Sequence, residues 1–487
     1  MTTHLRTSQR LLDGCTLFIG GEWKNGMETF QRFDPSSLSQ CTGVYAMSTE
    51  EMVADAYKYA KTAQENWAAF TAQQRSEVLR KASDILEEHL ETATRQLTAD
   101  MGKAIRDARG EVLRSIAILR YYSGDALQPS GDVYPSADNS TFLLTVEEPL
   151  GVICAITPWN FPFAIPTWKI APALVYGNSV VWKPAEAASG SAVLLAEVFE
   201  AAGLPSGVLN LITGSGSRLS KALTGNEALA AITFTGSGGV GNRIRQSVAD
   251  RNIKIQLELG GKNPAIVLAD ADLEDASLQV LRGAMYSTGQ RCTATSRVYV
   301  ERAVSEDFTQ KIIDKVNALI VGDPYIETTE VGPLGSPEQL KSVNQFLALA
   351  KSEGVTILAN ASAPDSDCFF PPMVITDVSA KSRLVTDEIF GPILVLQVVE
   401  NFQEAVSHAN NTEFGLSSSL FTRDLTTAMK FIKLTQSGVV HVNRETAGVE
   451  PHVPFGGLKG SSSLNREQGT AAREFFTTTK TVYIRST

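Results

Sequence analysis

The sequence predicts an α/β fold with two domains, each built on a parallel sheet, and a small projecting β arm. The chain has 487 residues, which is too long for one ordinary hydrophobic core and indicates two or three domains. Short β-rich runs alternate with helical stretches from Gly151 onward, and a second alternation runs from Asn263 to about His441. Because this alternation is typical of βαβ units, each stretch predicts a parallel sheet.

The individual elements follow in order along the chain. Residues 17–19 read as a strand, and helical periodicity dominates residues 49–126. A polar segment at 129–140 followed by an extended run at 141–147 predicts the arm. The strands and helices expected in the two alternations are 151–156, 180–182, 191–202 (helix), 208–212, 230–234, 264–268 and 273–286 (helix).

Composition and charge exclude several classes of protein. A hydrophobic content of 43% and a charged content of 20% are typical of a globular protein, and no apolar run reaches the roughly 20 residues of a membrane helix. The net charge of −10 argues against nucleic acid and anionic membrane surfaces as partners. Five widely spaced cysteines without a CxxC pair argue against disulfides and zinc, so we expect a cytoplasmic protein without a metal.

One cysteine and one glutamate stand out as candidates for covalent chemistry. Cys292 follows a small turn, Gly289-Gln290-Arg291, and Glu258 ends an apolar run beside Gly260 and Gly261. A cysteine attacks a carbonyl as a thiolate, so it needs a base or a lowered pKa. None of the five histidines lies near in sequence, although a histidine partner supplied by the fold stays open. A cysteine with a glutamate base fits covalent chemistry on an aldehyde.

A glycine-rich segment predicts a phosphate site. Residues 236–241 match G-x-G-x-x-G between an expected strand and an expected helix, which is the context that the motif requires. An ordinary glycine-rich turn is an equally good interpretation. The ribose-binding acid of a standard dinucleotide fold would fall near Glu258, which conflicts with its role as a base.

Three further segments each give only weak evidence of function when taken alone. Asn160, in the turn 157–162, can stabilise an oxyanion, but a plain turn explains it as well. Lys183 and Glu186 follow a strand and can meet ribose hydroxyls, or they can form a solvated pair. Glu388 and Phe390 lie beside a rigid Gly-Pro turn, whose plain interpretation is a loop with a core aromatic residue.

Together, and in this order, the motifs resemble the aldehyde dehydrogenase family. The resemblance extends from Phe18 to Val482. The segments that carry it are 159–160, 183–186, 234–237, 258–261, 289–292, 388–392 and 454–457. It implies two α/β domains and an atypical dinucleotide fold, which removes the conflict at Glu258. The boundaries that we expect are 1–128 with 149–257 for the cofactor domain, 258–441 for the catalytic domain, and 129–148 with 470–487 for the oligomerisation arm.

The resemblance also implies catalytic and cofactor residues. Cys292 is the expected nucleophile, Asn160 holds the oxyanion, Glu258 activates water, and Lys169 and Glu467 relay a proton. The expected cofactor is NAD or NADP, with Lys183, Glu186 and Glu388 at the riboses. The remaining residues expected around it are Ile156, Thr157, Pro158, Trp159, Gly216, Phe234, Gly236, Ser237, Gly241, Leu259 and Phe390.

The substrate is less well defined. Segments 117–124, 292–298 and 450–457 resemble the semialdehyde branch, which implies oxidation of 2-oxoglutarate semialdehyde to its acid. Succinic semialdehyde, an uncharged or aromatic aldehyde, and a non-catalytic structural role are the alternatives. Among side chains, arginine is best suited to bind a carboxylate. The candidate substrate residues are Arg120, Trp168, Tyr286, Arg291, Arg444 and Phe455. We further expect a homo-oligomer, a dimer or tetramer, in which the arm and strand 480–484 pair across subunits.

Overall fold

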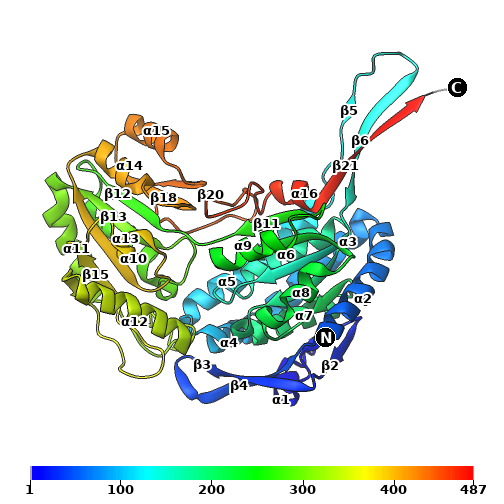
Figure 1. Cartoon of the computed structure of the whole chain (residues 1–487), viewed down its shortest axis with the longest axis horizontal. Coiled ribbons are helices and arrows are strands. Elements are labelled where there is room, and N and C mark those ends of the chain that lie inside the picture. Colours follow the sequence, from blue (N-terminus) through cyan, green and yellow to red (C-terminus); the bar gives the residue numbers. More distant parts are fainter. Residues whose placement is uncertain (1–2, 486–487) are drawn as a thin grey trace.

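The computed structural model describes residues 3–485 and places two sheet-centred bodies side by side with an arm that projects from one of them (Figure 1). The first body holds most of the N-terminal half of the chain, and the second holds residues from about 260 to 442. Each body has a seven-stranded sheet, and helices cover both sheets. The predicted fold class is therefore confirmed.

The first sheet is parallel at its centre and antiparallel at one edge. Strands β7, β8, β9, β10 and β11 run parallel, whereas β1 pairs antiparallel with β9 and β2 pairs antiparallel with β1. Its order is β11 (Lys254–Glu258), β10 (Leu229–Thr235), β7 (Val152–Thr157), β8 (Ser179–Pro184), β9 (Leu209–Leu211), β1 (Leu17–Ile19) and β2 (Glu22–Lys24). All six residues of β8 are buried, as expected of a central parallel strand that is covered on both faces.

Helices of the first body surround this sheet. The single helical region expected at 49–126 is divided into four helices by residues that cap or end them: Thr49 and Thr71 cap two N-termini with their side chains, and Gly102 ends a third helix in the left-handed conformation. The helices are α1 (Thr7–Asp13), α2 (Glu50–Ala69), α3 (Ala72–Glu88), α4 (Leu90–Met101), α5 (Ile105–Asp125), α6 (Ala164–Val175), α7 (Ser189–Ala201), α8 (Gly216–Gly225) and α9 (Gly238–Ser247).

The second sheet repeats the plan. It is parallel except for its first strand, β14, which runs antiparallel to β15. Its order is β14 (Thr356–Asn360), β15 (Met373–Thr376), β16 (Ile393–Val399), β13 (Thr295–Glu301), β12 (Asn263–Val267), β18 (Ser417–Phe421) and β19 (Val439–Val442). Its helices are α10 (Leu273–Met285), α11 (Ser305–Asn317), α12 (Pro337–Ser352), α13 (Arg383–Thr386), α14 (Phe402–Asn410) and α15 (Leu425–Leu434).

The arm is a three-stranded antiparallel sheet built from two distant segments. It combines β5 (Val133–Tyr134), β6 (Thr141–Pro149) and the C-terminal strand β21 (Thr477–Arg485), which follows α16 (Ala471–Phe476). Every residue of β21 pairs with β6, and Figure 1 shows the C-terminal strand lying along the arm. The two segments pair with each other within one chain, and their expected pairing across subunits stays a prediction. Two small two-stranded sheets complete the strands: the hairpin of β3 (Glu28–Asp34) and β4 (Ser37–Met47), and the pair of β17 (Phe414–Gly415) and β20 (Leu458–Lys459), which are distant in sequence.

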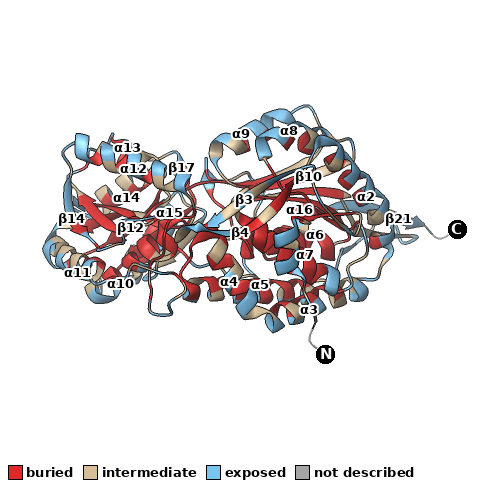
Figure 2. Cartoon of the chain, turned by 90° about the horizontal axis from the view of Figure 1, so that it is seen from below, coloured by how far each residue is buried: buried red, intermediate tan, exposed pale blue. Residues whose placement is uncertain are grey.

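Buried residues concentrate in the sheets and on the inner faces of the helices, and exposed residues lie on the outer helical faces (Figure 2). The strand ends that carry Thr157, Thr235 and Glu258 belong to three neighbouring strands of the first sheet, so these residues lie along one edge. Ligands of parallel sheets bind at this carboxyl edge. Within residues 3–485 we find no helix with the length and apolarity that crossing a membrane requires.

Candidate active site

Two cavities meet at a single reactive side chain. Cys292 lines a cavity of about 300 Å³ on one side and a second cavity of about 330 Å³ on the other. Ile165 of α6 also contributes to both walls. A nucleophile in this position is accessible to two ligands at once, one from each cavity.

The loop that carries Cys292 is held in an unusual backbone conformation. Ser287, Thr288 and Gly289 have φ values of 53°, 57° and 65°, which is the left-handed region that residues with a Cβ rarely adopt. A Cβ at Gly289 would lie 2.5 Å from the carbonyl oxygen of Gly391, so only glycine fits there. The Cys292 carbonyl accepts a hydrogen bond of 2.8 Å from the Asn263 side chain, which fixes the end of the loop to β12.

The environment of Cys292 favours the protonated thiol. Burial, together with the charges of Glu388, Glu258 and Glu467, raises its pKa to about 12. Glu388 lines the same cavity as Cys292. The thiol must therefore lose its proton to a nearby base when it attacks a carbonyl.

Asn160 lies beside the nucleophile loop, in the turn that follows β7. One N–H of its side chain donates to the Gln290 carbonyl at 2.9 Å, and its backbone carbonyl accepts a bond of 3.0 Å from Lys103 Nζ. A side-chain amide has two N–H groups, so the second remains able to donate to an oxyanion. Lys103 is itself paired with the buried carboxylate of Glu111, and this pair anchors the turn.

Glu258 ends β11 with one oxygen bonded and one free. Ser462 donates its hydroxyl to Glu258 Oε2, whereas Oε1 is buried and has no hydrogen-bond partner in the described part of the chain. Burial raises the pKa of Glu258 well above its usual value, and the charge of Glu467 raises it further. A carboxyl group whose pKa is raised in this way can take a proton at a physiological pH.

Lys169 and Glu467 form a fully buried ion pair behind Glu258. Lys169 Nζ contacts the Glu467 carboxylate and donates to Thr233 Oγ1 at 2.9 Å. The second oxygen of Glu467 is buried without a partner in residues 3–485. Glu467 reaches this position because its loop pairs with neighbouring backbone: Phe455 and Glu467 exchange hydrogen bonds of 2.6 and 2.7 Å.

The 330 Å³ cavity has the features of a phosphate-binding site. It lies at the N-terminus of α9, where Ser237 is the N-cap residue and the first backbone N–H groups can meet a phosphate. Thr235 Oγ1, beside it, is buried without a hydrogen-bond partner in the described structure. A Cβ at Gly236 would lie 2.6 Å from the Phe234 ring, so a larger residue would disturb this wall. Besides Cys292 and Ile165, the lining residues are Pro158, Trp159, Asn160, Thr235, Gly236, Ser237, Leu259, Gly260, Gln339, Ser342, Glu388, Ile389 and Phe390.

Glu388 is the charged side chain of this cavity. It accepts a hydrogen bond of 2.9 Å from the Gly261 N–H, and burial raises its pKa to about 7. Trp159 and Phe390 pack edge to face in the same wall, with ring centroids 5.6 Å apart. Pro158, Gly236, Ser237 and Leu259 also line the cavity as the sequence led us to expect.

Seven of the residues expected at the cofactor lie outside this cavity. Lys183 is buried near Gly216, where an added Cβ would come within 3.5 Å of its amine, and burial lowers its pKa to about 8 while the charge of Glu186 raises it. Glu186 begins a short 3₁₀ helix, Glu186–Ala188. Phe234 and Gly241 pack under the glycine loop. Ile156 and Thr157 belong to β7, and the Thr157 hydroxyl accepts from Trp182 Nε1 at 2.9 Å.

The 300 Å³ cavity has an aromatic wall and a charged wall. Trp168 and Phe455, with ring centroids 5.9 Å apart, are both in its lining, as is Arg291. These three were expected from the sequence. The other lining residues are Arg106, Asp107, Gly110, Glu111, Arg114, Phe161, Ile165, Ser287, Cys292, Thr293, Glu445, Ala447, Gly448 and Val449.

Three substrate candidates do not line this cavity. Arg120 is an exposed residue of α5 that pairs with Glu87 on the surface. Arg444 is exposed and is not among the lining residues, although its guanidinium lies near Gly448, which is one of them. Tyr286 donates its hydroxyl to Glu330 at 3.1 Å and packs under Arg106. Their positions in the sequence gave no information on which side of their element they occupy.

Sequence reasoning missed the contribution of α5. Arg106, Gly110 and Arg114 recur every four residues, and Asp107 and Glu111 do the same one position later, so all five occupy one face of the helix. This spacing was visible in the sequence, but a charged helical face usually indicates solvent. Gln339 and Ser342 of α12, in the cofactor cavity, carried no such signal.

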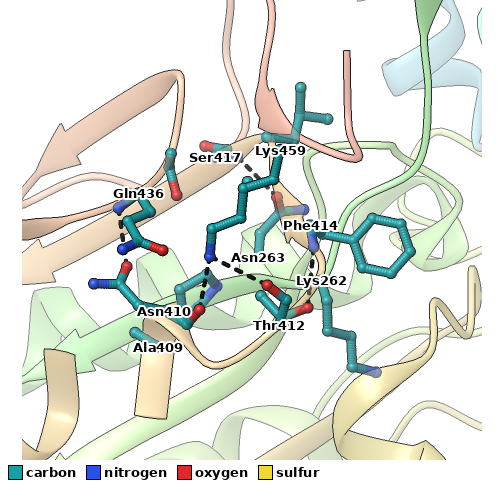
Figure 3. A pocket seen from close by; sticks show the side chains of 13 residues that line it. Lys262, Asn263, Ala409, Asn410, Thr412, Phe414, Ser417, Gln436 and Lys459 are labelled. Atoms are coloured by element: carbon teal, nitrogen blue, oxygen red, sulfur yellow. Dashed lines mark hydrogen bonds between the residues drawn. The ribbon is translucent and has the colours of Figure 1, made fainter. Parts of the chain in front are cut away.

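A third cavity, between β12, β18 and the loop at 409–415, is structural (Figure 3). Its volume of about 10 Å³ has room for about one water molecule. Figure 3 shows Lys459 reaching across it to the carbonyls of Asn410 and Thr412, at 2.7 and 3.1 Å, whereas the Lys262 amine points away. Its lining contains no cysteine, histidine or acid.

Comparison with known proteins agrees with this geometry. The aldehyde dehydrogenase family model matches residues 23–482. The chain is 42% identical to the alpha-ketoglutaric semialdehyde dehydrogenase of Bacillus subtilis over 96% of this chain and 97% of the relative. It is 40% identical to the alpha-ketoglutarate semialdehyde dehydrogenase of Haloferax volcanii over 96% and 98%. The structure of betaine aldehyde dehydrogenase from Staphylococcus aureus in complex with NAD⁺ superposes with a TM-score of 0.93 at 32% identity, covering 99% of this chain and 97% of that one.

Fold and site define an α/β enzyme with a cysteine nucleophile between two ligand cavities. The chain belongs to the aldehyde dehydrogenase family. It is an NAD(P)-dependent oxidoreductase that acts on the aldehyde group.

Proposed function

We propose that this enzyme oxidises 2-oxoglutarate semialdehyde to 2-oxoglutarate through a covalent intermediate on Cys292. The main support for this chemistry is that Cys292 lies where the two cavities meet. Attack on the aldehyde and removal of its hydride must occur at the same carbon, which therefore has to be reached from both cavities. The names of two relatives with at least 40% identity over almost the whole chain support the substrate.

The first half of the reaction is acylation of Cys292. Its thiolate attacks the aldehyde carbon, and the oxyanion that forms accepts hydrogen bonds from the Asn160 side chain and the Cys292 backbone N–H. The Gln290 carbonyl holds the Asn160 amide in place. When bound, NAD(P) supplies the acceptor for the hydride that leaves this carbon. The product of these steps on the protein is a thioester at Cys292.

The second half is hydrolysis of the thioester. Glu258 takes a proton from water, the resulting hydroxide attacks the thioester carbonyl, and the acid leaves as Cys292 regains its proton. Glu258 Oε1 has no partner in the described structure, so it is free to accept this proton. Glu467 and Lys169, which interact electrostatically with Glu258, pass the proton onward.

The cofactor would bind in the cavity beside α9. Gly236, Ser237 and Gly241 would form the phosphate-binding turn, and Glu388 would hold the ribose nearer Cys292. Lys183, which lies near Gly216, and Glu186 would hold the second ribose. The Glu186 carboxylate favours NAD over NADP because it repels a 2′-phosphate, whereas Lys183 accommodates one. Residues 1–128 with 149–257 form the cofactor domain, and 258–441 the catalytic domain.

Initial rates with three aldehydes test the substrate. The enzyme is assayed with 2-oxoglutarate semialdehyde, succinic semialdehyde and benzaldehyde, with NAD⁺ and NADP⁺ in parallel and Cys292→Ala as the blank. A kcat/KM that is highest for 2-oxoglutarate semialdehyde and is abolished in the blank supports the proposal. A preference for succinic semialdehyde or benzaldehyde, or activity that persists in Cys292→Ala, contradicts it.

The enzyme is a cytoplasmic homo-oligomer assembled through its arm. The arm and the C-terminal strand, residues 129–148 and 470–487 in our assignment, provide exposed apolar side chains: Val133, Tyr134, Phe142, Tyr483 and Ile484. Large apolar side chains that are exposed together are typical of a surface that contacts another subunit. The five cysteines are all free thiols in the described structure, which suits a reducing compartment.

A further inference from the structure

The charged wall of the substrate cavity, taken together with a lysine that lies behind it, has one more positive than negative side chain. Its lining includes three arginines, Arg106, Arg114 and Arg291, and three carboxylates, Asp107, Glu111 and Glu445. Lys103 lies behind the wall and neutralises Glu111. Four cations therefore face three carboxylates, which leaves one positive charge for a ligand.

Arg291 is not the free cation. Its guanidinium lies 3.5 Å from Glu445 Oε2 and 3.8 Å from Asp107 Oδ2, so two carboxylates surround it. Glu111 is committed as well, because it also accepts hydrogen bonds from the N–H groups of Phe163 and Ala164. The charges of Arg291, which precedes Cys292 in sequence, and of Glu111 are thus balanced within the protein.

Arg106 and Arg114 remain, and their surroundings differ. Arg106 is exposed, and its guanidinium lies over the Tyr286 ring at 5.2 Å, which is a contact at the cavity mouth. Arg114 lies two turns further along α5, about 12 Å away. It is half-buried and has neither a hydrogen bond nor an ion pair within residues 3–485, although the charges of Glu450 and Glu111 act on it from beyond ion-pair distance.

We propose, on the basis of the proposed function, that Arg114 binds the carboxylate of the aldehyde substrate. An arginine that is partly removed from water and has no counter-ion is stabilised by an anionic ligand, and its planar fork donates two parallel hydrogen bonds to a carboxylate. The burial of Arg114 lowers its pKa, which is evidence of this desolvation. The aromatic wall of Trp168 and Phe455 covers the aliphatic part of the substrate, so charge is read on the α5 side alone.

Removal of this one charge tests the assignment. Arg114→Gln is compared with Arg120→Gln, which removes a cation from the exposed part of the same helix, where Arg120 pairs with Glu87. Both are assayed with 2-oxoglutarate semialdehyde, with succinic semialdehyde, and with pentanal as an uncharged aldehyde. Arg106→Gln tests the mouth residue in the same way. Cofactor binding and the melting temperature of each variant establish that it is folded.

The expected result is selective loss of anionic substrates. Arg114→Gln lowers kcat/KM for both semialdehydes by about 100-fold or more, chiefly through KM, because a buried charge-assisted hydrogen bond to a carboxylate is removed. Its kcat/KM for pentanal stays within about threefold of wild type, and Arg120→Gln matches wild type on all three. Arg114→Lys, which keeps the charge but not the fork, gives an intermediate loss.

Several outcomes overturn the assignment. Equal losses for pentanal and the semialdehydes would mean a structural role, and a selective loss in Arg106→Gln instead would move the carboxylate site to the cavity mouth. If Arg114→Gln does not fold, wild-type kinetics in Arg114→Lys would overturn it as well. A wild-type enzyme that prefers benzaldehyde would contradict the proposed function, whereas unchanged semialdehyde kinetics in a folded Arg114→Gln would contradict only the role of Arg114.

Discussion

At the scale of single residues, the pKa values of a buried thiol and a buried carboxyl decide the chemistry. Burial raises the pKa of both Cys292 and Glu258, and the negative charge of Glu467 raises both further. The thiol therefore stays protonated in the resting protein, and Glu258 holds a proton more readily than an exposed carboxyl. These two shifts suit a base that exchanges protons with a nucleophile and then with water.

The pH profile of turnover reports on Glu258. Only its deprotonated form accepts a proton, so turnover rises with pH through the raised pKa of Glu258. The Ser462 hydroxyl stabilises the charged form and thus lowers that pKa. We expect Ser462→Ala to raise the pKa further and to move the acidic limb of kcat to higher pH, with the same plateau in alkaline buffer.

Ser463→Ala is the matched control for this experiment. The Ser463 hydroxyl accepts a bond of 3.0 Å from the Leu257 N–H and does not contact Glu258. Its profile should coincide with that of the wild type. Superimposable profiles for Ser462→Ala and wild type would show that Glu258 does not set this limb.

At the scale of elements, the turn between β10 and α9 depends on residues without a side chain. A Cβ at Gly241 would lie 2.7 Å from Leu259 Cδ2, and Leu259 lines the cofactor cavity. At Gly239, on the same helix, nothing lies within 4 Å. Gly241→Ala must therefore displace a cavity wall, whereas Gly239→Ala has open space.

We expect Gly241→Ala to raise the KM for the cofactor by about tenfold, because overpacking of this kind costs about 1–3 kcal/mol. Gly239→Ala should leave the KM close to that of wild type. The measurement is initial rate against NAD⁺ concentration at saturating aldehyde. Equal effects of the two substitutions would show that crowding against Leu259 is not the cause.

The elements were also where sequence reasoning succeeded and failed most clearly. Alternating strands and helices are local patterns, so the two parallel sheets, as a fold class, were predictable. The pairing of β21 with β6 joins segments more than 300 residues apart, and the sequence did not show that this occurs within one chain. The substrate face of α5 was missed because its charged residues resemble a solvated surface until α6 and the loop of Arg291 are placed against it.

At the scale of the whole molecule, the arm exposes apolar side chains that a single chain does not cover. Tyr483 and Ile484 are 71% and 54% exposed on β21, although both have large apolar side chains. We expect a Tyr483→Asp, Ile484→Asp double variant to form a smaller assembly than wild type, because the charges would be buried in the subunit contact. Sedimentation velocity measures the change.

Met27→Asp controls for a charge at an exposed apolar position, since Met27 is 94% exposed and lies outside the arm. Its assembly should match that of wild type. A double variant with an unchanged sedimentation coefficient, or a wild-type enzyme that is monomeric, would contradict assembly through the arm.

The two cavities, the thiol and the base act together in one reaction, and a single-turnover experiment with Glu258→Gln tests this. The variant is mixed with NAD⁺ and 2-oxoglutarate semialdehyde, reduced cofactor is followed by absorbance, and the protein is then analysed by intact mass and peptide mapping. We predict a burst of one reduced cofactor per subunit, slow turnover afterwards, and an acyl group on Cys292. Steady turnover at the wild-type rate, or a burst without any adduct on Cys292, would contradict the account.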